Sequence, residues 1–243
     1  MFTGRILRHS LPALILLLYA AAAHAQHVNA WTRLTVTMPV QERWKLSPEL
    51  QLRRQNTPPD MNIVRRPLLW SFRPWVYYSL KKNVWLAAAP FAYFRSYEVL
   101  NNVEQPDVRR SDEWRHTIAV GGRMKMTGAI TIQGRLAAEY RTWGLSPAYM
   151  RYRARGGAGI KMTERASMNL SYEYLMSTSV QPMSHMVTDQ QRIVALLKYN
   201  IVPDILAADA GYMYLLRYTG AGTGPEHDIV CNIRCNLKSQ KKH

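Results

Sequence analysis

Residues 129–143 read AITIQGRLAAEYRTW, and residues 148–162 read AYMRYRARGGAGIKM. Both segments alternate with a period of two: Ile132 and Leu136 share one face of the first segment, and Arg135 lies on the other. Successive side chains of a β-strand point to opposite faces, whereas a helix would mix the two sets around its circumference. The two segments therefore predict long strands, each with one apolar and one cationic face.

The same alternation recurs along the chain from about residue 30 onward. It predicts strands at Ala30–Pro39, Glu49–Gln55, Leu69–Leu80, Trp85–Tyr97, Trp114–Met126, Ala129–Trp143, Ala148–Met162, Ala166–Thr178, Gln190–Ile201, Ile205–Thr219 and Asp228–Leu237. Most of these runs reach the roughly 9–11 residues with which a strand crosses a bilayer, and strands of soluble proteins average only about 5–6. Bacterial single-chain barrels have even strand numbers, so we expect 10 or 12 strands, with one strand missed or one spurious near the N-terminus.

The predicted connections alternate in length. Short turns are expected near residues 81–83, 127–128, 163–165 and 202–204, and longer loops at Thr57–Ile63, Val99–Asp112, Ser179–Thr188 and Gly220–Glu226. This alternation is typical of outer-membrane barrels, whose closed sheet pairs every backbone N–H and C=O group between strands. We therefore predict a single-domain, all-β, antiparallel up-and-down transmembrane β-barrel of 10–12 strands.

Aromatic side chains on the apolar faces suit the girdles found at membrane interfaces. They are Trp70, Tyr78, Tyr140, Tyr152, Tyr172 and Tyr218. The alternative is a soluble periplasmic barrel or sandwich, in which the apolar faces would pack inward and the arginines would face solvent. Alternation alone is compatible with both structures; strand length and loop rhythm favour the membrane barrel.

The first 25 residues predict a secretory signal peptide. Arg5 and Arg8 give a basic start, Leu11–Ala23 is an apolar run too short to span a bilayer, and Ala23-His24-Ala25 is a small-x-small cleavage site. The barrel is then expected over residues 26–237, followed by a basic tail at 238–243. Export combined with a membrane barrel predicts the bacterial outer membrane as the location.

Composition excludes several other classes of protein. The 243 residues carry 32 Lys+Arg against 16 Asp+Glu, a formal net charge of +16, with 47% hydrophobic residues and 2 Cys. The apolar content is too high for a disordered chain, and two cysteines are too few for a disulfide scaffold. A basic chain can bind nucleic acid, but the signal peptide and the lack of a recognition module argue against that partner.

Three segments resemble one known family. They are Trp31–Arg54, Trp75–Tyr97 and Glu113–Arg141, which look like its opening hairpin, its second hairpin and its central strand pair. The family is the group of outer-membrane β-barrels known as domain of unknown function 2490. The resemblance covers nearly the whole mature chain through diffuse patterning, implies an outer-membrane barrel, and supplies no activity.

Cations dominate the polar faces of the predicted strands. The residues expected to line the lumen are Arg115, Arg123, Arg135, Arg141, Arg151, Arg153, Arg155, Lys198 and Arg217. Fixed positive charge concentrates anions and repels cations, so the lumen is expected to serve a passive channel or a binding barrel for small anionic solutes. Two further interpretations stay open: a structural envelope protein, and a lumen plugged by cross-strand pairing with carboxylates such as Glu139, Glu173 and Asp209.

A lipid-modifying enzyme is the alternative from a different class. A hydrolase needs a serine, a histidine and an acid or amide that meet in space, and the candidates are His116, His185, Ser111, Ser177 and Ser184. No G-x-S-x-G nucleophile elbow is present, so we expect no enzyme, and no spacing suggests a metal or other cofactor. The expected partners are outer-membrane lipid, the barrel assembly machinery during insertion, and small anionic solutes. The solute, the openness of the pore and the oligomeric state stay open at this point.

Overall fold

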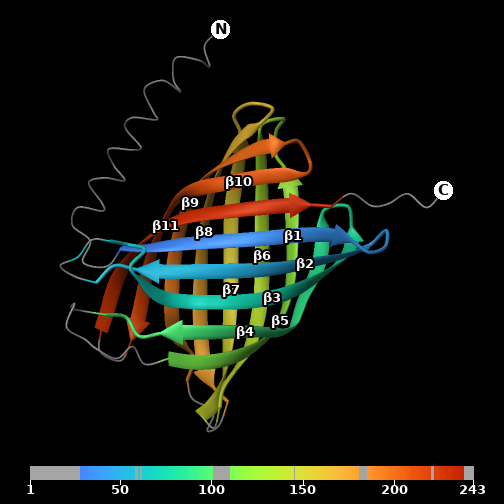
Figure 1. The fold of residues 1–243 in the computed structure, drawn as a ribbon. Coiled ribbons are helices and arrows are strands. Elements are labelled where there is room, and N and C mark those ends of the chain that lie inside the picture. The colour runs from blue at the N-terminus through green and yellow to red at the C-terminus, as the bar shows by residue number, and fades with distance from the viewer. Residues whose placement is uncertain are drawn as a thin grey trace.

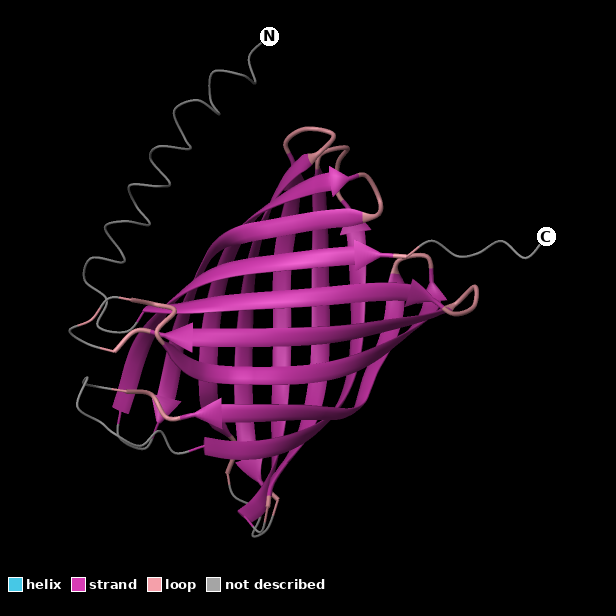
Figure 2. Cartoon of the chain, in the orientation of Figure 1, coloured by secondary structure: helices cyan, strands magenta, loops and turns pink. Residues whose placement is uncertain are grey.

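The computed structural model describes residues 28–57, 60, 62–100, 110–144, 146–180, 185–219 and 222–237. The predicted signal peptide (1–25), the basic tail (238–243) and the candidate Ser184 lie outside these residues. All regular secondary structure within the described ranges consists of strands (Figure 2). No helix long and apolar enough to cross a membrane occurs there.

Every predicted strand segment is a strand in the structure. The elements are β1 (Val28–Pro39), β2 (Trp44–Gln55), β3 (Arg66–Lys81), β4 (Val84–Tyr97), β5 (Arg110–Lys125), β6 (Ile130–Trp143), β7 (Ser146–Lys161), β8 (Ala166–Ser179), β9 (Val187–Val202), β10 (Leu206–Thr219) and β11 (Gly222–Asn236). The predicted all-β barrel is confirmed, because these strands form one closed sheet in which each strand pairs with the next along the chain.

The expectation of an even strand number is wrong for the described residues. The barrel closes with eleven strands, and its seam joins β1 to β11 (Figure 1). Consecutive strands run antiparallel, so an odd number leaves the first and last strands pointing the same way. The seam is accordingly a parallel ladder, in register from Val28 opposite His227 to Thr37 opposite Asn236. A parallel ladder still pairs the backbone groups of both strands, so the seam has no free sheet edge along these residues.

The predicted loop at Gly220–Glu226 is also wrong, because β11 already begins at Gly222. Its first residues pair with β10, in register from Gly222 opposite Thr219 to Glu226 opposite Leu215. The seam ladder with β1 begins only at His227. Residues 222–226 therefore form a short edge of the sheet, paired on one side only. Pro225 lies in this stretch, and proline is tolerated at a sheet edge because it has no backbone N–H to donate.

The apolar faces of the strands point away from the barrel axis. Ile118 is 68% exposed and Leu136 is 60% exposed, whereas the chain neighbours of Ile118, Thr117 and Ala119, face the opposite side and are buried. The polar faces enclose the interior, where Glu113, Glu139 and other charged side chains are buried. This is the arrangement of a membrane barrel and the reverse of the soluble alternative.

Aromatic clusters lie on the outer surface toward both ends of the barrel. Trp70, Tyr93 and Trp114 form a chain of ring contacts across β3, β4 and β5, with centroids 5.1 Å apart in both pairs. Near the short turns, the rings of Trp44 and Tyr78 lie 4.8 Å apart. Two aromatic zones separated along the strands match the girdles that sit at the two interfaces of a bilayer.

Candidate functional site

The candidate site is the interior of the barrel, and strand parity decides which side chains enter it. On β5 the odd-numbered residues face inward, so Glu113, Arg115 and Thr117 share the interior with Arg141 and Glu139 of the neighbouring β6. The same parity carries through the cross-strand register to β7 and β8. The local alternation of the sequence therefore gathers its charges around one enclosed space.

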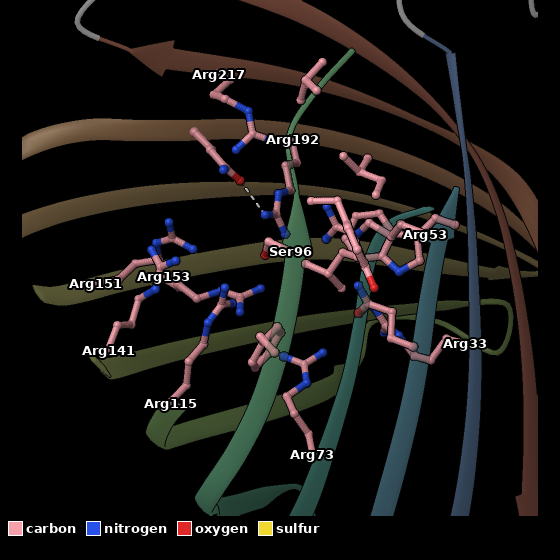
Figure 3. Close-up of a pocket in the computed structure, with 18 residues that line it drawn as sticks. Arg33, Arg53, Arg73, Ser96, Arg115, Arg141, Arg151, Arg153, Arg192 and Arg217 are labelled. Carbon is pink, nitrogen blue, oxygen red and sulfur yellow. Dashed lines mark hydrogen bonds between the residues drawn. The ribbon is translucent and has the colours of Figure 1, made fainter. Parts of the chain in front are cut away.

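A cavity of about 270 Å³ occupies the interior toward the long-loop end and borders Tyr97 and Val99 (Figure 3). We call it the loop-side cavity. Nine arginines line it: Arg33, Arg53, Arg73, Arg115, Arg141, Arg151, Arg153, Arg192 and Arg217. No aspartate or glutamate is among its described lining residues. A cavity whose surface presents this many guanidinium groups attracts anions.

Carboxylates hold many of these arginines from behind the cavity surface. Glu113 is buried at 1% exposure and accepts hydrogen bonds from two guanidinium groups at once. The Arg115 Nε and Nη2 atoms donate to it at 2.8 and 2.7 Å, and Arg141 Nη2 donates at 3.0 Å. A guanidinium has five N–H donors, so each arginine keeps donors that Glu113 does not use.

A second network runs across β6 to β9. Arg153 Nη1 donates to Glu139 at 2.6 Å, and Arg153 Nη2 donates to Glu173 at 2.7 Å. Glu173 also accepts from Arg192 Nη1 at 3.3 Å, and Arg192 donates to Gln190. Four strands are thus tied together by charge-assisted hydrogen bonds, which are about twice as strong as neutral ones.

Further pairs continue the pattern around the barrel. Arg73 Nε donates to Glu49 at 3.0 Å, and Arg33 lies 3.6 Å from the same carboxylate. Arg217 Nε donates to Glu226 at 2.6 Å, and an ion pair joins Arg151 to Asp189. The expected pairing of lumen cations with carboxylates is therefore present, yet it leaves the loop-side cavity free of described acidic lining residues.

Aromatic rings support several arginines, two of which also pair with Glu113. The guanidinium carbon of Arg53 lies 3.2 Å from the centroid of the Trp31 ring, and that of Arg115 lies 3.6 Å from the Phe94 ring. Arg141 stacks at 4.5 Å from Trp143. Such cation–π contacts fix the plane of a guanidinium, and its edge remains available to donate hydrogen bonds.

A second cavity of about 540 Å³ extends toward the short turns and reaches Thr37, Lys45 and Arg123. We call it the turn-side cavity. It shares with the loop-side cavity the lining residues Trp31, Arg33, Arg73, Arg153 and Arg192. Its lining includes Glu49 and Glu173, so it is less strongly cationic in character than the loop-side cavity. These shared side chains border both cavities.

Eight of the nine residues predicted to line the lumen contribute to these cavities. Arg115, Arg141, Arg151, Arg153 and Arg217 border the loop-side cavity, and Arg123, Arg135, Arg153 and Arg155 border the turn-side cavity. Lys198 borders neither; it lies opposite Asp209 in the β9–β10 ladder. Asp209 in turn accepts a hydrogen bond from Arg234 at 2.5 Å.

The prediction missed the cations of the first three strands, Arg33, Arg53 and Arg73, as well as the carboxylates Glu49 and Glu113 that orient their neighbours. A signal was available in Leu46–Arg53, where Ser47, Glu49 and Gln51 alternate with apolar residues and proline. It was weak because Pro48 interrupts the apolar face.

The hydrolase candidates that the structure describes lie on different strands, faces or connections. His116 points outward, where its Nδ1 hydrogen-bonds the carbonyl oxygen of Pro90, whereas Ser111 lies on the inward face of the same strand. Ser177 lies on β8 and His185 lies exposed in the connection to β9. Among the described residues, no group of three or more His, Cys, Asp or Glu side chains could hold a metal ion.

Comparison with known proteins gives a family match and matches to solved structures. A family model with the description "Protein of unknown function (DUF2490)" matches residues 28–224. No curated protein matches the chain.

Two of the matching structures are structures of the same protein. "Outer-membrane expressed OmpT of Vibrio cholerae" is 12% identical with a TM-score of 0.40, and the match covers 71% of this chain and 55% of that chain. "OmpT (in-vitro folded), an outer membrane protein of Vibrio cholerae" is 8% identical with a TM-score of 0.39, covering 79% of this chain and 86% of that chain. The present chain thus spans about half the length of the first neighbour.

Proposed function

This chain belongs to the family described as protein of unknown function DUF2490, and because that description carries no activity, we propose a function from the geometry: an outer-membrane β-barrel that admits small anionic solutes through an arginine-lined interior. The observation that carries the proposal is the loop-side cavity, where nine arginines and no described carboxylate form the lining. Rings of fixed cationic side chains favour anions in pores, because they raise the local anion concentration and repel cations.

The location in the outer membrane has independent physical support. Large apolar residues cover the outside of the barrel, and a surface of this kind is stable against acyl chains but not against water. Closure of the sheet pairs the backbone groups that hydrocarbon cannot solvate. The basic, apolar and small-residue pattern of residues 1–25 supports export.

The two cavities support passage along the barrel axis. They share five lining residues and extend from the long-loop end toward the short turns. Cations line both of them, so an anion that leaves one cavity meets guanidinium groups in the next. Multiple weak sites of one sign allow an ion both to enter and to leave.

Conductance measurements test this proposal. The refolded protein in planar bilayers under a potassium chloride gradient should give a current whose reversal potential reports a preference for chloride. The double variant Arg135→Gln/Arg155→Gln should reduce that preference. These residues face each other across β6 and β7 in the turn-side cavity, and neither has an ion pair among the described residues. Their loss therefore removes charge from the lumen without breaking a pair.

Arg165→Gln is the matched control, because Arg165 is exposed in the turn between β7 and β8. It removes one positive charge outside the lumen and should leave the reversal potential unchanged. A cation-selective current, or no current from protein that keeps heat-modifiable migration on a gel, would contradict the channel. Turnover of the bilayer lipid that is lost with His116→Ala would instead support the enzymatic alternative.

A further inference from the structure

Arg53 on β2 differs from most arginines of the loop-side cavity because an aromatic ring, and no carboxylate, fixes its position. Its guanidinium stacks on Trp31 at 3.2 Å from the ring centroid. With the Gln51 amide oriented to satisfy both donors, its oxygen accepts from Arg53 Nε at 2.9 Å and from Trp31 Nε1 at 3.3 Å. Among the described residues Arg53 forms no ion pair, so the terminal nitrogens of its guanidinium retain their full donor capacity.

The cavity presents guanidinium groups from opposite walls. Arg53 and Arg33 come from β2 and β1, whereas Arg141 and Arg151 come from β6 and β7, about halfway around the closed sheet. Figure 3 shows these two groups entering the same space from opposite sides, with Arg192 and Arg217 between them. An anion with a single charged group can contact only one wall closely, whereas a ligand with charged groups at two ends can contact both.

Several donors in this cavity lack a protein acceptor. The Nε atoms of Arg33, Arg151 and Arg192 are buried and have no hydrogen-bond partner among the described residues. A buried donor without an acceptor costs about 1–3 kcal/mol, and more when it is charged. These enclosed atoms show that the protein itself does not satisfy every guanidinium donor of the two walls.

We propose that the loop-side cavity is a binding site for a compact polyanion that carries at least two phosphate or carboxylate groups, with Arg53 anchoring one group and Arg141 and Arg151 the other. This inference rests on the proposed admission of anions to the interior. The planar fork of arginine matches the two oxygens of a carboxylate or phosphate. The cavity volume of about 270 Å³ suits a small solute.

Calorimetric titration of the refolded protein in nonionic detergent at about 0.15 M salt tests the site. Sodium pyrophosphate and citrate are the two-ended probes, and inorganic phosphate is the single-group probe. The wild-type protein should bind pyrophosphate or citrate saturably and at least ten times more tightly than phosphate. This comparison uses no variant, so it does not depend on the folding of any substituted chain. Because no lipid is present, any binding that is measured is to the soluble anion and not to a lipid headgroup.

Variants at two neighbouring positions separate the anchor from general electrostatics. Arg53→Gln should weaken pyrophosphate binding at least tenfold, and Arg53→Lys should weaken it less, because Lys keeps the charge but loses the fork and the planar stacking. Arg54→Gln is the matched control: Arg54 is exposed on the opposite face of β2, where it donates to the Val64 carbonyl oxygen. Its variant should bind as the wild type does.

Equal affinity for phosphate and pyrophosphate would overturn the proposal, as would equal weakening by Arg53→Gln and Arg54→Gln. The two proposals fail separately. An anion-selective current from protein that does not bind pyrophosphate or citrate would refute this site and leave the channel intact. Saturable polyanion binding without any current would refute the channel and leave this site intact.

Discussion

Two kinds of arginine line the loop-side cavity: those that pair with a carboxylate, some of which also stack on an aromatic ring, and Arg53, which stacks on a ring and has no carboxylate partner among the described residues. Arg141 shares Glu113 with Arg115, whereas Arg53 rests on Trp31. The first kind stiffens the barrel by joining strands. The second kind keeps its charge for a ligand. The division of labour explains how an interior rich in salt bridges can still contain a strongly cationic cavity.

Glu113 should contribute strongly to the stability of the folded barrel. Replacing it by Gln leaves Arg115 and Arg141 buried against a neutral group, and breaking a buried ion pair typically costs roughly 3–5 kcal/mol. We expect Glu113→Gln to lower the free energy of unfolding by about this amount, measured by urea denaturation of the protein folded into lipid vesicles.

Glu164→Gln provides the control for that measurement. Glu164 pairs with Lys161 at 2.6 Å in an exposed turn, with 89% of its side chain accessible. Exposed pairs contribute about 0–1 kcal/mol, so this variant should unfold almost as the wild type does. Equal effects of the two variants would show that the Glu113 network adds nothing beyond a surface pair.

At the residue scale, alternation predicted which side of each strand bears cations, but not which cation is compensated. The pairing of Glu139 with Arg153 joins neighbouring strands and depends on register, which a period of two does not specify. The inward aromatic residues were also unpredictable. Trp31 and Trp75 lie on the cationic face, although their apolar character suggests the lipid side.

At the scale of elements, the parallel seam makes a prediction that the native cysteines allow to be tested. Cys231 lies opposite Thr32 across β1 and β11, and both side chains are exposed on the outer face. Neighbouring strands lie about 4.8 Å apart, within the Cα separation of about 4.4–6.8 Å that a disulfide requires. In a Cys235→Ser background, Thr32→Cys should therefore form a disulfide with Cys231 on oxidation, detected by mass spectrometry of proteolytic fragments.

Leu34→Cys is the control for the seam. Residue 34 lies opposite Ile233, two residues further along, which places it roughly 8 Å from Cys231 by strand geometry. It should form no bond. If Leu34→Cys crosslinks and Thr32→Cys does not, the seam has a different register; if neither crosslinks, β1 and β11 do not meet as described.

The strands themselves were predictable because alternation is a local signal that shows within about ten residues of sequence. The pairing that closes the barrel was not predictable from such a local signal. The pairing of β1 with β11 joins residues about 200 positions apart, and the direction of that ladder follows from the count of strands and not from any pattern within them. The start of β11 was missed for a related reason: Pro225 and two glycines signal a loop locally, and only the pairing with β10 makes them a strand.

At the scale of the whole molecule, the orientation of the two faces determines the solvent in which the chain is stable. Ile118 lies near the middle of β5 and is 68% exposed. If its surroundings are acyl chains, Ile118→Lys should cost about 2–4 kcal/mol, because a lipid-facing cation at the bilayer midplane is destabilising. The measurement is the free energy of unfolding from lipid vesicles.

Met126→Lys is the control for that change, because Met126 is exposed in the short turn between β5 and β6, outside the strands. It should leave stability nearly unchanged. In a water-soluble barrel, adding a charge at Ile118 would be neutral or favourable. If Ile118→Lys leaves the free energy of unfolding unchanged, the interpretation that this face of the barrel contacts lipid is wrong.

The odd strand number has a topological consequence for the chain as a whole. With eleven crossings, Val28 begins at the rim that bears the long loops and Asn236 finishes at the rim that bears the short turns (Figure 1). An inserted molecule of this kind has the first residue of β1 and the last residue of β11 on different sides of the bilayer. Reporter peptides fused before Val28 and after Asn236 would then sample two compartments, one the extracellular medium and the other the periplasm.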